Sequence, residues 1–185
     1  VDYLKKKREK INFCLVGEPT NPDKLGEMIK IGRRGSLTGK LKIFGLQGHV
    51  AYPHRAINPS TIIVKILKEL KEIRFDKGTK DFQPTNLEVT KINMSNKADN
   101  VIPAMAEATF NIRFNNKHSS NSIKKKLKRI FSKISKKNKS KYKIEYKVSG
   151  EAFLTKPNKT TFMIQNIIKK VTNIKPKLST TVGTS

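Results

Sequence analysis

The segment AEATFNIRF at residues 106–114 decides the fold that this sequence predicts. Apolar residues stand at every second position from Ala106 to Phe114, and polar residues fill the positions between them. Such alternation is typical of a β-strand with one buried face, because successive side chains of a strand point to opposite sides. We therefore expect a strand here, with its even-numbered residues facing a core.

Further strands are predicted outward from this one. Residues 36–44 and 142–148 show the same alternation, and residues 86–92 show it less regularly. Residues 28–31 are consistent with another short strand. The apolar run at residues 11–16 predicts a short buried strand, because it ends at a turn that contains Gly and Pro.

Two helices are predicted between these strands. Asn58 followed by Pro59 is typical of a helix start, since Asn caps free backbone amides and Pro suits the first helical position. Ser119 or Ser120 caps a second amphipathic helix. The order from 36 to 150 is therefore β-α-β-β-α-β, which predicts a ferredoxin-like α+β unit with both helices on one face of the sheet.

The flanking segments do not complete a second domain by themselves. Residues 1–35 offer one or two strands, and residues 151–185 offer one amphipathic helix. We expect these flanks to be two parts of a larger α/β domain into which the unit at 36–150 is inserted.

The composition of the 185 residues leaves two explanations for the charge open. Lys and Arg number 40 against 14 Asp and Glu, a net charge of +26, which is consistent with nucleic-acid binding. Only 7 of the 40 are Arg, the residue that nucleic-acid readers favour, so a mutational bias toward lysine codons explains the charge equally well. No run of 18 apolar residues predicts a membrane helix, and a single cysteine, Cys14, excludes an internal disulfide.

A few residues could carry chemistry. Glu18 follows the strand predicted at 11–16 and is either a turn carboxylate or a metal ligand whose partners are missing. Arg33 and Arg34, between glycines, favour recognition of a substrate carboxylate over a solvated turn, and the glycines would let a ligand approach the backbone. His49 lacks the spacing of a zinc helix and is either exposed or a donor to an oxyanion, and His118 is expected to be exposed.

Together these segments resemble the M20-type zinc aminoacylase/carboxypeptidase family, and its desuccinylating more than its deacetylating members. Each segment alone is weak evidence for this family, but all of them occur in the order in which the family has them, from end to end. The matching residues are 14–20, 32–39, 48–54, 58–59, 100–103, 110–114 and 180–185.

The resemblance implies a cytoplasmic, two-domain homodimer that dimerises through the unit at 36–150, its lid domain, and binds two Zn²⁺ per subunit, with Co²⁺ as a possible substitute. It implies hydrolysis of a small anionic substrate, N-succinyl-LL-2,6-diaminopimelate, to succinate and LL-2,6-diaminopimelate. Metal-activated water and a Glu general base outside this chain would carry the reaction.

The resemblance also implies roles for individual residues. Glu18 would bind zinc, and His49 would stabilise the oxyanion of the partner subunit's site. The residues implied to contact substrate are Arg33, Ser36, Tyr52, Asn100, Arg113 and Thr184, with Tyr52 also reaching across the dimer. Asp99 and Val182 depart from the family pattern, which has Asn and Gly there.

Most catalytic residues of the family fall outside the matched segments, so we expect these 185 residues alone to be inactive. Two alternatives come from other classes: a basic ferredoxin-like module that binds nucleic acid, and a dimerisation module without catalysis. The segment 117–147 holds 13 Lys and Arg against one acid, but it lacks the interleaved aromatic residues of a single-strand binder, so we expect no nucleic-acid or membrane partner.

Overall fold

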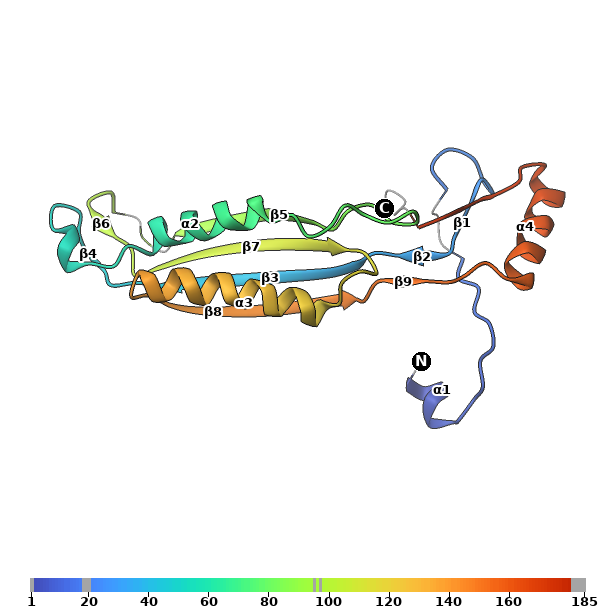
Figure 1. Ribbon diagram of the computed structural model, residues 1–185, viewed down its shortest axis with the longest axis horizontal. Helices are drawn as coiled ribbons and strands as arrows, with labels where there is room; N and C mark the ends of the chain where they lie inside the picture. The colour runs from blue at the N-terminus through green and yellow to red at the C-terminus, as the bar shows by residue number, and fades with distance from the viewer. Residues whose placement is uncertain (1, 18–20, 95, 97, 181–185) are drawn as a thin grey trace.

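A four-stranded antiparallel sheet forms the centre of the protein, and in the computed structural model its strands lie in the order β5-β7-β3-β8 (Figure 1). These strands are β3 (Gly35–Phe44), β5 (Asn86–Met94), β7 (Met105–Phe114) and β8 (Lys141–Gly150). The alternation in the sequence predicts all four correctly, to within two residues at each end. The structure describes residues 2–17, 21–94, 96 and 98–180.

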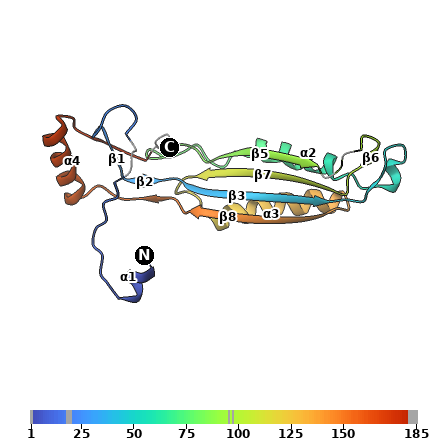
Figure 2. The same ribbon diagram turned by 180° about the vertical axis from the view of Figure 1, so that it is seen from behind.

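Two helices, α2 (Pro59–Glu72) and α3 (Ser120–Lys137), cover one face of this sheet (Figures 1 and 2). The core lies between helices and sheet, and burial of each large apolar side chain there contributes about 1.5–3 kcal/mol. The opposite face, which we call the open face, carries the polar residues of the alternating strands. Among the fully buried core residues are Leu37, Leu41, Ile63, Ile66, Phe110, Ile112, Leu127 and Phe131.

Both helices begin at the capping residues that the sequence predicts. The Asn58 side chain accepts a hydrogen bond from the Ser60 amide at 2.9 Å, ahead of Pro59. Ser119 and Ser122 form a reciprocal capping box, in which each hydroxyl accepts from the other residue's amide. These bonds satisfy amides that the first helical turn leaves without intrahelical partners.

Gly35 and Gly39 make room for aromatic rings within the sheet. They lie opposite Phe114 and Phe110 in the β3–β7 ladder, and a Cβ atom at either glycine would overlap the facing ring. The prediction that the glycines beside the arginines admit a ligand is therefore wrong for Gly35, because the Phe114 ring fills that space.

The end of the sheet where β3 finishes, which we call the tip, carries short elements that the sequence did not predict. Strand β4 (Gly48–His49) pairs antiparallel with β6 (Val101–Ile102), and a 3₁₀ helix, η1 (Pro53–Arg55), follows β4. Strands of two residues have no periodicity, so these segments looked like a loop and a turn.

The other end of the sheet, which we call the base, joins the two flanking segments. Strand β2 (Gly32–Arg33) pairs antiparallel with β9 (Phe153–Leu154), and β1 (Met28–Lys30) pairs parallel with β10 (Lys177–Ser179). Helix α4 (Lys159–Thr172), the predicted amphipathic helix, lies beyond them (Figure 1). Residues from the two ends of the chain thus meet in one parallel pair.

The prediction of a buried strand at residues 11–16 is wrong. This segment has no regular secondary structure, and its apolar side chains, including Phe13 and Leu15, are more than half exposed. No described strand pairs with it, so its backbone forms no ladder. Helix α1 (Asp2–Lys6) precedes it.

Candidate functional site

Three of the predicted site residues lie together at the base. Ser36 on β3 is opposite Arg113 on β7, so both belong to the open face. Ser36 is buried and Arg113 is exposed. The guanidinium of Arg33 lies beside Gly150 at the end of β8. The base therefore presents one hydroxyl and two guanidinium groups, which are suited to recognition of carboxylates.

The Arg33–Arg34 pair separates to two sides of the base. Whereas Arg33 lies toward β8, Arg34 Nη1 donates to the Pro84 carbonyl at 3.3 Å and to Asn86 Oδ1 at 3.0 Å, beside β5. Burial, and then the charge of Arg113, lower the pKa of the Arg34 guanidinium. No arginine belongs to an ion pair among the described residues, so no described carboxylate neutralises this group of guanidiniums.

The other predicted site residues that the structure describes, His49, Tyr52 and Asn100, lie together at the tip. The Asn100 carbonyl accepts from the Val50 amide at 3.0 Å, and the His49 and Tyr52 ring centroids are 6.1 Å apart. His49 Nδ1 accepts a hydrogen bond from the Ala51 amide at 3.1 Å. In a neutral imidazole the proton then sits on Nε2, so this exposed ring can donate outward.

The two groups of residues lie at opposite ends of the sheet (Figure 1). Strand β3 runs from base to tip, and its eight steps from Ser36 to Phe44 span roughly 26 Å at about 3.3 Å per residue. A small substrate cannot touch both ends of one chain. The structure thus brings together Arg33, Ser36 and Arg113, and separately His49, Tyr52 and Asn100.

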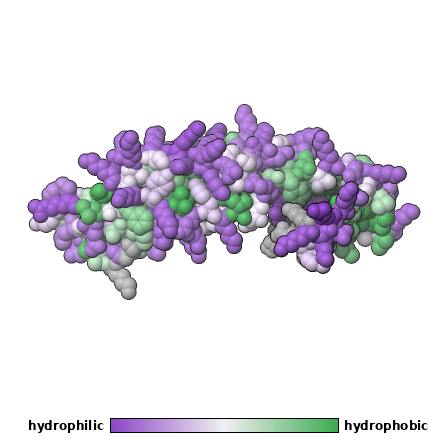
Figure 3. All heavy atoms as spheres, turned by 90° about the horizontal axis from the view of Figure 1, so that it is seen from below, coloured by the Kyte–Doolittle hydropathy of each residue, from purple (hydrophilic) through white to green (hydrophobic). Residues whose placement is uncertain are grey.

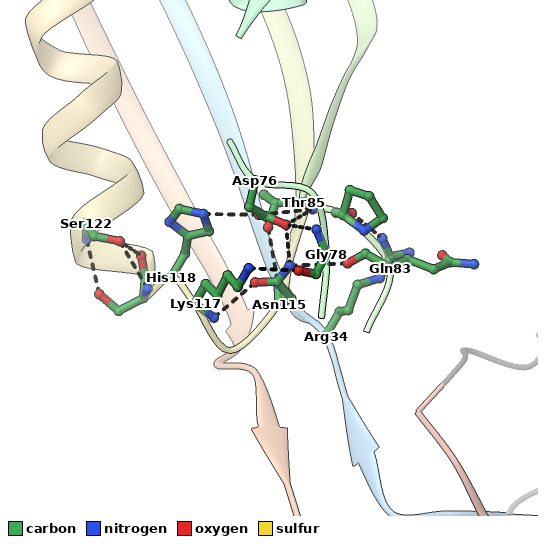
Figure 4. Close-up of polar contacts among 11 residues, drawn as sticks. Arg34, Asp76, Gly78, Gln83, Thr85, Asn115, Lys117, His118 and Ser122 are labelled. Atoms are coloured by element: carbon green, nitrogen blue, oxygen red, sulfur yellow. Dashed lines mark hydrogen bonds and ion pairs between the residues drawn. The ribbon is translucent and has the colours of Figure 1, made fainter. Parts of the chain in front are cut away.

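A buried carboxylate that sequence reasoning missed fixes the loops at the base (Figure 4). The side chain of Asp76, between α2 and β5, is only 6% exposed. It accepts from the Gly78 amide at 2.6 Å, from Asn115 Nδ2 at 2.7 Å and from the Thr85 amide at 3.3 Å. It also lies 3.1 Å from Nε2 of His118. Asp76 thereby joins the loop before β5 to the loop after β7.

The charge of Asp76 is stabilised by these donors. Burial by itself raises the pKa of this carboxyl, but the hydrogen bonds from Thr85, Gly78 and Asn115 outweigh burial and lower the pKa to about 2. The prediction that His118 is merely exposed is wrong, because its side chain is 21% exposed and contacts Asp76. The sequence offered one signal, the Asp-x-Gly pattern of a turn at 76–78.

Two predicted site residues, Glu18 and Thr184, lie outside the described residues. Within the described part of the chain, no three His, Cys, Asp or Glu side chains gather where they could hold a metal ion. The described residues therefore do not by themselves fit the zinc ions that the resemblance implies. In the same part of the chain, no helix combines the length and apolar character needed to span a membrane.

Comparison with known sequences finds one matching family and a set of similar proteins. Residues 31–139 match the M20 peptidase dimerisation domain. Over all 185 residues the chain is 76% identical to the succinyl-diaminopimelate desuccinylase of Pelagibacter ubique and 50% identical to that of Rickettsia felis. It covers 48% and 49% of those two proteins, so the chain spans about half the length of the curated relatives it matches.

Comparison with solved structures agrees at the level of the fold. The chain superposes on the aminopeptidase PepT of Bacillus cereus with a TM-score of 0.71, and on a tripeptidase of Staphylococcus aureus with a TM-score of 0.72. Each match covers 89% of this chain and 42% of the other, at 16% sequence identity. The arrangement of sheet, helices and base is therefore one that known peptidases share.

Proposed function

Because the chain belongs to the M20 peptidase family through its dimerisation domain, we propose that it is the middle part of a succinyl-diaminopimelate desuccinylase. The complete protein would hydrolyse N-succinyl-LL-2,6-diaminopimelate: water adds to the amide carbonyl, the C–N bond breaks, and succinate and LL-2,6-diaminopimelate leave. The observation that carries this proposal is the 76% identity to such an enzyme over every residue of the chain.

We assign the substrate contacts to the two ends of the sheet. At the base, Arg33, Ser36 and Arg113 bind the substrate, whose carboxylates match their guanidinium and hydroxyl groups. At the tip, His49 donates Nε2–H to the oxyanion that forms at the amide carbonyl, and the Ala51 amide on Nδ1 supports this tautomer. Tyr52 and Asn100 contact substrate beside His49. We extend the same role to Thr184.

The separation of base and tip supports a site shared by two copies of the chain. If two central sheets lie side by side and antiparallel, the tip of each copy reaches the base of the other. The substrate then does not need to span the roughly 26 Å between the two groups of one chain. Each active site is formed by the base residues of one copy and the tip residues of the other. We therefore propose a homodimer in which His49 and Tyr52 act in the partner's site.

Charge favours one of the two sheet edges for this pairing. The edge formed by α3 and β8 carries eleven basic residues and one acid, so a two-fold axis there would oppose like charges. Figure 3 views the molecule from the side of β8, and most of the residues on this side are hydrophilic. The edge formed by α2 and β5 carries four basic and three acidic residues, with Val64 and Ile92 more than half exposed. We propose that the dimer forms through α2 and β5.

The metal chemistry belongs to parts of the protein beyond the described residues. We propose that Glu18 joins ligands from the rest of the complete protein in holding two Zn²⁺, which Co²⁺ could replace, and that a Glu there is the general base. The metal would supply the activated water.

We also propose how the chain divides. Residues 36–150 form a ferredoxin-like lid, as supported by the order β3-α2-β5-β7-α3-β8, the sheet order and the single helical face. Residues 1–35 and 151–185 belong to the catalytic domain, as supported by the pairing of β1 with β10. The lone Cys14 fits a reducing compartment, so we place the protein in the cytoplasm.

Complementation between inactive variants of the complete protein tests this proposal. His49→Ala and Arg113→Ala should each lower succinate release by at least about 100-fold. When the two variants are unfolded, mixed in equal amounts and refolded, half of the dimers are mixed and each mixed dimer has one intact site. About a quarter of wild-type activity should return.

Controls separate the two halves of the proposal. Each variant refolded alone must stay inactive, and the wild-type protein must recover its activity through the same procedure. No recovery in the mixture would contradict the shared site. Absence of succinate release from the wild-type protein with zinc would contradict the desuccinylase assignment itself.

A further inference from the structure

A hollow at the base, beside the proposed substrate contacts, has no role so far. It has a volume of about 410 Å³ and lies between Arg34 and the loop that leads into β5. Hollows of roughly 300–1,000 Å³ hold small-molecule ligands in many proteins. Its lining residues are Arg34, Lys77, Thr79, Lys80, Asp81, Phe82, Gln83, Pro84 and Thr180. We call it the base pocket.

The lining of the base pocket is cationic. Arg34, Lys77 and Lys80 contribute three positive charges, and Asp81 contributes one negative charge. The described residues give Arg34 only neutral acceptors, the Pro84 carbonyl and the Asn86 amide oxygen, and both bond to Nη1. Because a guanidinium carries five N–H donors, Nε and Nη2 remain to bind an anion.

The wall of the base pocket is held in place before any ligand arrives. The Thr79 hydroxyl accepts from the Asp81 and Phe82 amides, which closes the turn at the pocket. Asp76 anchors the start of the same loop to Asn115 (Figure 4). A preformed wall lowers the ordering cost that binding would otherwise carry.

The base pocket adjoins the proposed substrate contacts. Asn86, which bonds Arg34, lies opposite Arg113 in the β5–β7 ladder, and Arg113 lies opposite Ser36 in the β7–β3 ladder. At about 4.8 Å between strands, Asn86 and Ser36 are roughly 10 Å apart on the open face. Thr180, from the C-terminal flank, closes the pocket by a hydrogen bond to the Asp81 carbonyl.

We propose that the base pocket is a carboxylate subsite, in which Arg34 binds one carboxylate of the substrate or product as a bidentate partner. Lys77 and Lys80 add to the positive electrostatic potential of the pocket. This inference rests on the proposed function, which supplies a substrate with several carboxylates. Arg34 is then a specificity-determining residue, distinct from Arg33 on the other side of the base.

Calorimetric titration of the complete protein with the two products tests this subsite. Succinate and LL-2,6-diaminopimelate are titrated separately, which shows the half of the substrate to which the bound carboxylate belongs. Arg34→Gln should weaken binding of one product by about tenfold or more, and Lys77→Gln with Lys80→Gln should weaken the same product by a few-fold. Arg74→Gln, an exposed arginine just beyond α2, is the matched control and should bind like wild type.

Two results would overturn the subsite. One is unchanged affinity for both products in Arg34→Gln; if that variant does not fold, unchanged affinity in the exposed double lysine variant is decisive instead. The other is equally tight binding of inorganic phosphate, which would show a site without carboxylate preference. These readouts do not use hydrolysis, so a protein that binds through Arg34 but releases no succinate contradicts only the proposed function.

Discussion

Asp76 stabilises the base through its charge, so its contribution should depend on pH. Its pKa in the folded protein is about 2, below the ordinary value of 3.8. A lowered carboxyl pKa adds stability that is complete above the ordinary pKa and is lost as the pH falls through the folded value. The difference corresponds to about 2 kcal/mol near neutral pH.

Asp76→Asn should therefore lower the free energy of unfolding by about 2 kcal/mol at pH 7, and this deficit should shrink between pH 4 and pH 2. Urea unfolding at a series of pH values measures it. Asp99→Asn, in an exposed turn at the tip, should show no such deficit. A deficit in Asp76→Asn that stays constant down to pH 2 would show that packing, and not charge, is responsible.

Gly39 matters for packing because it has no side chain. A methyl group at this position would overlap the Phe110 ring, so Gly39→Ala should destabilise the protein by about 1–3 kcal/mol despite the lower chain entropy of alanine. Equilibrium denaturation measures the loss, and Lys40→Ala on the open face should stay within about 0.5 kcal/mol of wild type.

Phe110→Leu provides the internal check on that explanation. If the ring is the obstacle, Gly39→Ala should cost less in the Phe110→Leu background than in the wild type. Additive effects of the two changes would reject the steric explanation.

At the scale of elements, strand β5 is where we place the partner. Ile92→Lys puts a charge in the proposed α2–β5 interface, so it should weaken dimerisation by at least about tenfold and lower activity in parallel. Val148→Lys is the matched control, since Val148 is also partly exposed but lies on β8 at the opposite edge. Sedimentation at several concentrations distinguishes them, and a monomeric Val148→Lys beside a dimeric Ile92→Lys would move the interface to the other edge.

The elements that sequence reasoning predicted are those whose signals are local. Strand β7 and helix α2 carry their periodicity and caps within a few residues, so both were found with nearly correct ends. Strand β10 depends on pairing with β1, about 150 residues away, and its three residues have no pattern of their own. The segment 11–16 shows the converse, because its apolar run is a strand signal without a described partner.

The residues of the candidate site also divide into those with a local sequence signal and those whose role depends on a distant partner. The sequence indicated Arg33, Ser36 and Arg113 through motifs, and the ladders place Ser36 and Arg113 side by side. It could not show that Arg34 turns away toward Asn86, since adjacent residues look equivalent in a motif. His118 was misjudged because its partner, Asp76, lies 42 residues earlier and meets it only in the folded chain.

For the whole molecule, part of the net charge of +26 now has a location. Helix α3 and strand β8 carry eleven basic residues and one acid, a net charge of +10, along the edge of the sheet that runs from tip to base. We expect this surface to bind DNA only through counterion release, with a loss of about a thousandfold in affinity from about 50 mM to about 200 mM salt and no sequence preference. Fluorescence anisotropy with two unrelated duplexes measures this, and tight, sequence-dependent binding at physiological salt would contradict it.

The short ribbon formed by β2 and β9 is the point about which the long central sheet can tilt. Two residues from each strand join the long sheet to the flanking segments, and the tip lies roughly 30 Å farther along β3. A tilt of about 5° at this ribbon therefore moves the tip by about 2–3 Å, nearly the length of a hydrogen bond. In the site that we propose, the position of His49 relative to the reacting carbonyl thus depends on the angular stiffness of a few backbone hydrogen bonds far from the histidine.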